Sequence, residues 1–251
     1  MVELLLAAAL VACDGTAAAP LIVAHRGGMD SGFPENTLPA FRHAAAAGAD
    51  LIELDLRTTR DGHLVVLHDP RVDRTTDGRG RVQELDLEAL MRLDAGGGTR
   101  VPTLLEALQA TRDLNVELLF DLKTGAPLNH GDLADAVRRF HDPARVWFGV
   151  RTLADRQRLA ALLPQARFLG FVPDVDDVDG FLAAGMAAIR LWPAWLTSDP
   201  GLVERIHGTG AQVWVTAGRA SAERLAALVE LGVDAVLTDH PAAAVDRLRC
   251  R

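Results

Sequence analysis

Two histidines in the first half of the chain have the setting that acid–base chemistry requires. His25 and His68 each end a short apolar run and stand beside further polar residues. A histidine titrates near neutral pH, so such a pair could act as the general base and general acid of a hydrolysis. The other six histidines lack this setting, and we expect them to be structural.

A pair of carboxylates points to a metal ion. Glu53 and Asp55 stand two residues apart in an apolar run, which places both side chains on one face of a strand. If that face lines a barrel lumen, the two groups repel each other and lose hydration, and a divalent cation would relieve both costs. Asp121 is a natural third ligand, and ligands that are all oxygen favour Mg2+ or Ca2+ over zinc. The alternative is a buried ion pair, such as that of Glu53 with Arg57 or Lys123.

Two cations near these groups favour a phosphate-bearing substrate. Arg26 offers a bidentate fork and Lys123 a point charge, and both suit phosphoryl oxygens. Gly27 and Gly28 would let the backbone approach a ligand closely, although a glycine pair can also be a simple turn.

Composition narrows the function classes. The chain has 251 residues, which suits one α/β barrel or a two-domain protein. Its formal charge of −8 argues against a nucleic-acid partner but allows a phosphate substrate, because a few local cations or a metal suffice. Cys13 and Cys250, the two cysteines, lie at opposite ends and make neither a zinc thiolate site nor a disulfide framework.

The elements that must position these residues alternate along the chain between short apolar runs and stretches with apolar residues at helical spacing. Strands are expected at residues 21–24, 51–56, 116–122, 146–150, 167–171, 187–191, 212–215 and 235–237. Helices are expected at residues 38–47, 104–111, 133–140, 153–163, 178–184, 201–207 and 222–230. The alternation predicts an α/β fold of parallel strands, a (β/α)8 TIM barrel. A doubly wound open sheet stays the alternative, because periodicity does not show whether a sheet closes.

One segment after the second strand breaks this alternation. Residues 64–67 predict an extra strand, and the Gly- and Arg-rich stretch at about 69–102 predicts a small insertion with one short helix near 87–93. In such a barrel the active-site residues lie at the C-terminal ends of the strands and in the loops that follow. We therefore expect the candidate residues to meet at one mouth of a single domain at residues 20–251.

Several sequence runs together resemble the glycerophosphodiester phosphodiesterase family. They are HRGG at 25–28, PENT at 34–37, GAD at 48–50, IELD at 52–55, TTRDG at 58–62, VVLHD at 65–69, DRTTDG at 73–78, VPTL at 101–104 and LTDHP at 237–241. The resemblance extends in order over roughly residues 20–250, and its first half is highly specific.

The resemblance implies a function and a set of roles. The reaction would be the hydrolysis of a small-molecule glycerophosphodiester to an alcohol and glycerol 3-phosphate, with a divalent cation as cofactor. His25 and His68 would be the acid/base pair, and the metal ligands would include Glu53 and Asp55. The substrate would be bound by Arg26 and Lys123, which would contact the phosphate, and by Glu35, an active-site carboxylate.

The chain departs from the family pattern at two places. Asp121 stands where the family commonly has Glu, which puts the metal affinity and the choice of metal in question. A Trp-Thr-Val-Asn type segment common in the family reads WVTAG at residues 214–218, without the Asn. Trp214, and with it Trp192, would line the pocket of the leaving group, or both are core aromatics.

Three other functions stay open. One is a lysophospholipase D-like phosphodiesterase on the same barrel. Another is a barrel that binds phosphorylated alcohols without turnover, although the presence of both histidines weighs against it. A glycoside hydrolase could also use paired carboxylates, but it would not need the two histidines with Arg26 and Lys123.

The first residues predict a location. The run LVAC at residues 10–13 resembles the lipobox of a bacterial lipoprotein, so that residues 1–19 would be a leader and a lipid on Cys13 would anchor an extracytoplasmic enzyme to a membrane. The segment before it contains Glu3 and no Lys or Arg, and we therefore expect the gene to start further upstream. The alternative is an incidental Cys13 in an apolar helix of a cytoplasmic protein.

Overall fold

The computed structural model describes residues 19–29 and 32–249, in which eight parallel strands close into a barrel. The ring runs in the order β1, β9, β8, β7, β6, β5, β4 and β2, and a further pairing of β1 with β2 closes it. Its strands are β1 (Leu21–Ala24), β2 (Leu51–Thr58), β4 (Glu117–Leu122), β5 (Val146–Val150), β6 (Arg167–Gly170), β7 (Ala188–Leu191), β8 (Gln212–Gly218) and β9 (Ala235–Thr238). The predicted TIM barrel is confirmed, and the open-sheet alternative is wrong.

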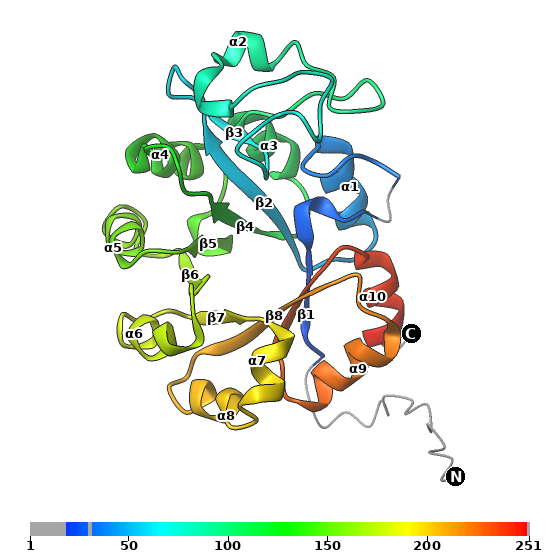
Figure 1. Ribbon diagram of the computed structural model, residues 1–251, viewed down its shortest axis with the longest axis vertical. Coiled ribbons are helices and arrows are strands. Elements are labelled where there is room, and N and C mark those ends of the chain that lie inside the picture. The colour runs from blue at the N-terminus through cyan, green and yellow to red at the C-terminus, as the bar shows by residue number, and fades with distance from the viewer. Residues whose placement is uncertain (1–18, 30–31, 250–251) are drawn as a thin grey trace.

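Helices surround the strands in an outer ring (Figure 1). They are α1 (Leu38–Ala46), α3 (Leu104–Thr111), α4 (His130–Phe140), α5 (Leu153–Leu162), α6 (Val178–Ala183), α7 (Pro193–Ser198), α8 (Leu202–His207), α9 (Ala222–Glu230) and α10 (Pro241–Leu248). The sequence did not predict α7 and α10. Both begin with a proline, which is tolerated in the first helical turn but reads as a break in a helical pattern.

The core has two layers, because successive side chains of a strand point to opposite faces. On β2, Leu51 faces the lumen, where it packs in a cluster with Leu119, Leu169 and Trp214, whereas Ile52 faces the helices. Glu53 and Asp55 continue the lumen side of β2 toward its C-terminal end. The strand pattern thus delivers carboxylates to the mouth of the barrel.

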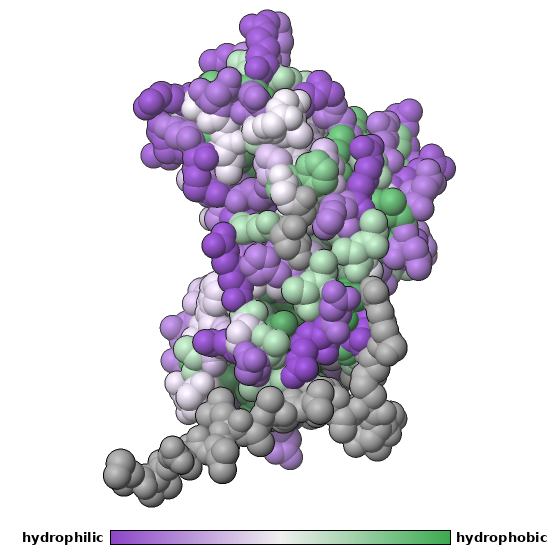
Figure 2. All heavy atoms as spheres, turned by 90° about the vertical axis from the view of Figure 1, so that its right-hand side faces the viewer, coloured by the Kyte–Doolittle hydropathy of each residue, from purple (hydrophilic) through white to green (hydrophobic). Residues whose placement is uncertain are grey.

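The extra strand and the insertion lie outside the ring. The strand β3 (Leu64–Val66) pairs antiparallel with β2, and the insertion (residues 69–102) contains η2 (Val82–Glu84) and α2 (Leu87–Leu90). Its apolar residues form a small core of their own, which includes Val72, Val82 and Leu90. Figure 1 shows the insertion beyond β3 at one end of the molecule, and Figure 2 shows a mainly hydrophilic surface over that end.

The predicted leader, the lipid-bearing Cys13 and Cys250 lie outside the described residues. Within residues 19–29 and 32–249, no helix is long and apolar enough to cross a membrane.

Candidate active site

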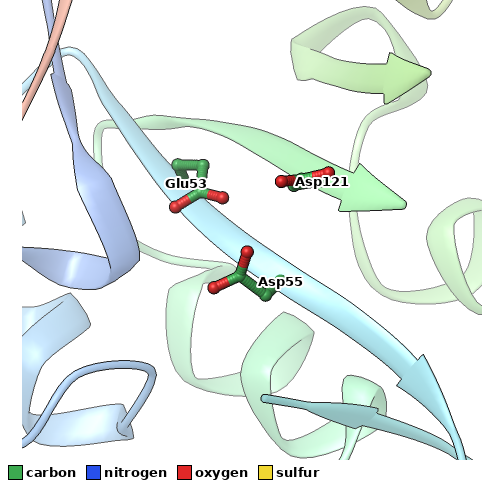
Figure 3. A group of neighbouring side chains, drawn as sticks. All are labelled: Glu53, Asp55 and Asp121. Atoms are coloured by element: carbon green, nitrogen blue, oxygen red, sulfur yellow. The ribbon is translucent and has the colours of Figure 1, made fainter. Parts of the chain in front are cut away.

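Three buried carboxylates form the centre of the barrel mouth. Glu53 and Asp55 on β2 and Asp121 on β4 are 1%, 0% and 4% exposed, and each offers an oxygen within 4.8 Å of the others. Asp55 and Asp121 are direct neighbours across the two strands. Figure 3 shows the three carboxyl groups facing one another. The register of β2 against β4 therefore builds the cluster.

The electrostatics of this cluster fit a divalent cation. Burial, and then repulsion from Asp55 and Asp121, raises the pKa of Glu53 well above its usual range. The backbone N–H of Arg26 donates to Glu53 Oε2 at 2.7 Å. A set of three buried oxygen donors that repel one another is the kind of site that Mg2+ or Ca2+ occupies. A bound cation would allow Glu53 to ionise.

Two of the carboxylates also have cationic partners. Lys123 Nζ lies 2.7 Å from Asp55 Oδ1 and also pairs with Asp121. Arg151, at the end of β5, holds Asp121 with both of its terminal nitrogens, one of them Nη2 at 3.0 Å from Oδ2. Burial raises the pKa of Asp121, but Arg151 and Lys123 outweigh it and hold the pKa at about 2.

The two ion pairs of Glu53 that the sequence offered as examples of the alternative to a metal are absent among the described residues, although Asp55 and Asp121 are paired. Glu53 pairs with neither Arg57 nor Lys123 there. Arg57 instead donates to the backbone carbonyl of His68, from Nε at 2.9 Å and from Nη2 at 2.6 Å. Ion pairing thus accounts for Asp55 and Asp121 and leaves Glu53 as the carboxylate without a cation.

His25 is oriented by a carboxylate from the neighbouring strand. Its Nδ1 lies 2.7 Å from Asp239 Oδ1. The two residues meet because Ala24 of β1 stands opposite Thr238 of β9, and each strand delivers its next residue to the mouth. The hydrogen bond with His25 lowers the pKa of Asp239 and keeps it ionised. The contact leaves Nε2 as the ring nitrogen that can face a substrate.

His68 is oriented in the same way by the residue after it. Its Nδ1 lies 2.6 Å from Asp69 Oδ1, and Arg74 Nε of the insertion donates to Asp69 Oδ2 at 2.6 Å. That contact with Arg74 lowers the pKa of Asp69 strongly. Burial lowers the pKa of His68 and favours the neutral ring.

Arg26 and Glu35 connect the carboxylate cluster to Arg74 of the insertion. Arg26 has a left-handed backbone with φ of 55°, and its Nη1 lies 3.0 Å from Glu35 Oε1. Arg74 donates to both oxygens of Glu35 at 2.8 Å. Burial raises the pKa of Glu35, but Arg74 and Arg26 together lower it. Asn36 donates to Asp55 Oδ2 at 2.7 Å and so fixes one carboxylate of the cluster.

The first glycine of the pair after Arg26 has a steric reason to lack a side chain. Gly27 has a φ of +83°, and a Cβ there would lie 2.9 Å from the ring of Phe41. The left-handed turn therefore needs a residue without a side chain.

Comparison with known proteins agrees with this geometry. A model of the family described as "Glycerophosphoryl diester phosphodiesterase family" matches residues 25–243. A glycerophosphodiester phosphodiesterase of Caldanaerobacter subterraneus subsp. tengcongensis is 34% identical over 245 residues, which cover 91% of this chain and 98% of that relative. The chain belongs to the glycerophosphoryl diester phosphodiesterase family.

Solved structures of glycerophosphodiester phosphodiesterases share the fold. One from Agrobacterium tumefaciens has a TM-score of 0.76 and 29% identity, and the match covers 89% of this chain and 98% of that one. A phosphodiesterase of Oleispira antarctica, solved in complex with the product sn-glycerol-3-phosphate, has a TM-score of 0.81 and 25% identity over 91% and 97%. The resemblance to the family is confirmed, and the chain is an enzyme of a hydrolase family.

The structure separates the two tryptophans that the sequence left open. Trp214 is fully buried in the lumen, 4.6 Å between ring centroids from Trp147, and its Nε1 donates to Gln212 at the start of β8. It is thus a core residue below the mouth, as the alternative expected, and it does not line the substrate pocket. Trp192 follows β7 and is 45% exposed.

Sequence reasoning assigned no role to five residues that hold candidate site residues in place, namely Asn36, Asp69, Arg74, Arg151 and Asp239. Asp239 and Asp69 hold the histidines, and Arg74 and Arg151 hold carboxylates. Asp239 and Asp69 stood in quoted family runs, where their position beside a histidine or after a strand was the available signal. Arg151 has no such signal, because its partner is 30 residues away and is found only from the pairing of β4 with β5.

Proposed function

We propose that this enzyme hydrolyses glycerophosphodiesters to an alcohol and glycerol 3-phosphate by metal-dependent catalysis with two histidines. The observation that carries the proposal is the pairing of His25 with Asp239 and of His68 with Asp69 around a buried cluster of three carboxylates. Family membership supports the substrate class.

Glu53, Asp55 and Asp121 would hold the divalent cation, Mg2+ or Ca2+. Bound there, such an ion supplies Lewis-acid stabilisation of the charge on phosphoryl oxygens. The chain's own residues prepare the site, since Asn36 fixes Asp55 and the backbone of Arg26 fixes Glu53.

The two histidines would move the protons. Each has its Nδ1 engaged by a carboxylate, so Nε2 is the atom that accepts or donates a proton at the substrate. One histidine takes the proton of the attacking group while the other gives a proton to the oxygen of the leaving alcohol. Burial keeps His68 in the neutral form that accepts a proton.

Arg26 and Lys123 would bind the phosphate. Both cations lie against the carboxylate cluster, where each contacts Asp55 and could also reach an incoming phosphoryl group. Glu35 holds the guanidinium of Arg26 in place and is itself held by Arg74. We infer that Glu35 orients the phosphate contact.

Product analysis tests this proposal. The protein is incubated with glycerophosphocholine and glycerophosphoglycerol in the presence of Mg2+ or Ca2+, and the products are identified by NMR. We expect glycerol 3-phosphate together with the free alcohol. Release of the alcohol as its phosphate, or no hydrolysis of either diester with any divalent cation, would contradict the proposal.

We also propose that residues 1–19 are a leader ahead of a domain at residues 20–251, and that a lipid on Cys13 holds the enzyme at a membrane outside the cytoplasm. The proposal rests on the run LVAC at residues 10–13. Expression of the full reading frame with a fatty-acid probe tests it. Label must appear on the wild type and be lost in Cys13→Ser, and an unlabelled wild type would contradict the anchor.

A further inference from the structure

The strands β5, β6 and β7 bring a group of arginines and aromatic rings to the barrel mouth. Arg151 follows β5 and Phe171 follows β6, whereas Arg190 lies in β7 and Trp192 follows that strand. Arg190 is two residues after Ala188, a member of the lumen cluster, so it is on the lumen side of β7 at the C-terminal end. We call these four residues the arginine–aromatic group.

Arg190 is a buried cation without a counterion among residues 19–29 and 32–249. The residue is 7% exposed, and its Nε and Nη1 have no hydrogen-bond partner there. Burial, followed by repulsion from Arg151, lowers the pKa of Arg190 to about 10, which leaves it charged at neutral pH. A buried charge is ordinarily paired, so an anionic ligand would supply the counterion that Arg190 lacks among the described residues.

The aromatic rings hold this cation in place. The guanidinium carbon of Arg190 lies 4.0 Å from the centroid of Trp192 and 5.0 Å from that of Phe171. Phe171 also contacts Arg151, whose guanidinium carbon is 4.8 Å from the ring. The position of Phe171 depends on Gly149, because a Cβ there would lie 2.0 Å from the ring. The absence of a side chain at Gly149 thus leaves space for the ring of Phe171, which contacts both arginines.

The two arginines, Arg151 and Arg190, differ in their ion pairing. Arg151 is already committed to Asp121 of the carboxylate cluster. Arg190 is close enough to Asp121 for the two charges to attract, yet forms no ion pair with it. Arg190 is therefore the arginine of this group that no carboxylate among the described residues holds.

We propose that Arg190, held by Phe171 and Trp192, forms a subsite for an anionic group, a phosphate monoester or a carboxylate, on the leaving alcohol. This inference rests on the proposed function and deepens it by naming the substrate class. A cationic alcohol such as choline would need a free aromatic face. Arg190 lies over one face of the Trp192 ring, and its positive charge repels a second cation.

Three matched diesters test the subsite. Each is a diester of glycerol 3-phosphate. The leaving alcohol is glycerol in the neutral diester, a glycerol that carries a phosphate monoester in the second, and glycerate, which carries a carboxylate, in the third. For the wild type we expect kcat/KM for at least one anionic diester to exceed that for the neutral one by about tenfold, the size of one charge-assisted hydrogen bond. In Arg190→Met the ratio should fall to about one, and Arg190→Lys should keep part of it.

The control variant is Arg158→Met, which removes an exposed arginine of α5 and should leave the ratio unchanged. A wild type without preference for an anionic diester would overturn the inference, as would a preference of wild-type size in both Arg190→Met and Arg190→Lys. Equal loss on all three diesters leaves the ratio unchanged and also overturns it. If Arg190→Met does not fold, Arg190→Lys decides. Arginine pairs more tightly with an anionic group than lysine does, so the ratio of Arg190→Lys must lie below that of the wild type.

Failure of the proposed function is recognised separately. If none of the diesters is hydrolysed in the presence of Mg2+ or Ca2+, the hydrolytic function is wrong, and calorimetry with the same diesters still tests the subsite. The wild type must then bind an anionic diester about tenfold more tightly than the neutral one, and Arg190→Met must lose that difference. Equal affinities would overturn the inference.

Discussion

The two sides of the barrel mouth have opposite electrostatic designs. On the side built by β1, β2, β4 and β9, carboxylates and histidines are fixed by named partners, as Asp239 fixes His25 and Asn36 fixes Asp55. On the side built by β5, β6 and β7, Arg190 is fixed by aromatic rings and has no counterion among the described residues. In the proposed function the first side carries the proton transfer and the metal ion, and in the further inference the second side discriminates between substrates.

The largest expected effect is the loss of either histidine on the catalytic side. His25→Ala and His68→Ala should each lower kcat by about 10²-fold or more, the usual contribution of a general acid or base. Steady-state kinetics on glycerophosphoglycerol measures it, with circular dichroism to show that the variants fold. The control is His207→Ala, which removes an exposed histidine that pairs with Asp234 outside the mouth. A histidine variant with kcat near the wild type would remove that residue from the proton-transfer pair.

The next effect concerns the partner of a histidine on the same side. Asp239→Asn leaves the shape of the contact but removes the charge that holds His25, and kcat should fall by about tenfold, as for other outer hydrogen-bond partners. The loss should appear in kcat and leave KM nearly unchanged, because Asp239 acts through His25. A variant that changes only KM would show that Asp239 contacts the substrate instead.

The carboxylate cluster makes a prediction about stability and pH. The folded pKa of Glu53 is raised, so in metal-free protein the folded state binds more protons than the unfolded state once the pH exceeds the ordinary value of 4.5. Stability from this group is present below that value and is lost as the pH rises toward the raised pKa. Metal-free Glu53→Gln should therefore melt at a higher temperature than metal-free wild type at pH 7. Scanning calorimetry in chelator checks it. A lower Tm for Glu53→Gln than for the wild type would contradict the destabilisation of the metal-free protein by Glu53.

The smallest expected effect concerns the packing of the arginine–aromatic group. Gly149→Ala would push its Cβ into Phe171 and should destabilise the protein by about 1–3 kcal/mol, the usual cost of overpacking. The matched control is Gly180→Ala in α6, where a Cβ meets nothing within 4 Å and alanine should stabilise by about 0.5–1 kcal/mol. Chemical denaturation measures both. Equal effects at the two glycines would mean that Phe171 moves without cost.

The same comparison explains what the sequence could predict. The catalytic side depends on short runs such as HRGG and IELD, in which strand alternation and local spacing already place His25 and Glu53. The apolar runs also predicted the strands closely, for example β1 and β5 at their exact bounds. The helix α4 begins three residues earlier than expected, because the side chain of Asn129 caps it by accepting from the N–H groups of Gly131 and Asp132.

The arginine–aromatic side could not be predicted, because its contacts depend on register across strands. Arg190 reads in the sequence as a single charge in an apolar run, and only the order of β5, β6 and β7 brings it to Phe171. Trp214 shows the same limit, because its place in the run WVTAG did not reveal that it points into the lumen core. Local patterns give the elements and the family runs, and packing inside the barrel gives the rest.

The most direct test of the account is a cation titration of turnover. Chelated protein shown by metal analysis to be metal-free is titrated with Mg2+ or Ca2+ while the release of glycerol 3-phosphate from glycerophosphoglycerol is followed. We expect no hydrolysis without cation, saturable recovery with one of the two, and a much weaker apparent affinity in Asp55→Asn, which keeps the shape of a cluster residue but loses its charge. Full hydrolysis by the metal-free protein would contradict the account.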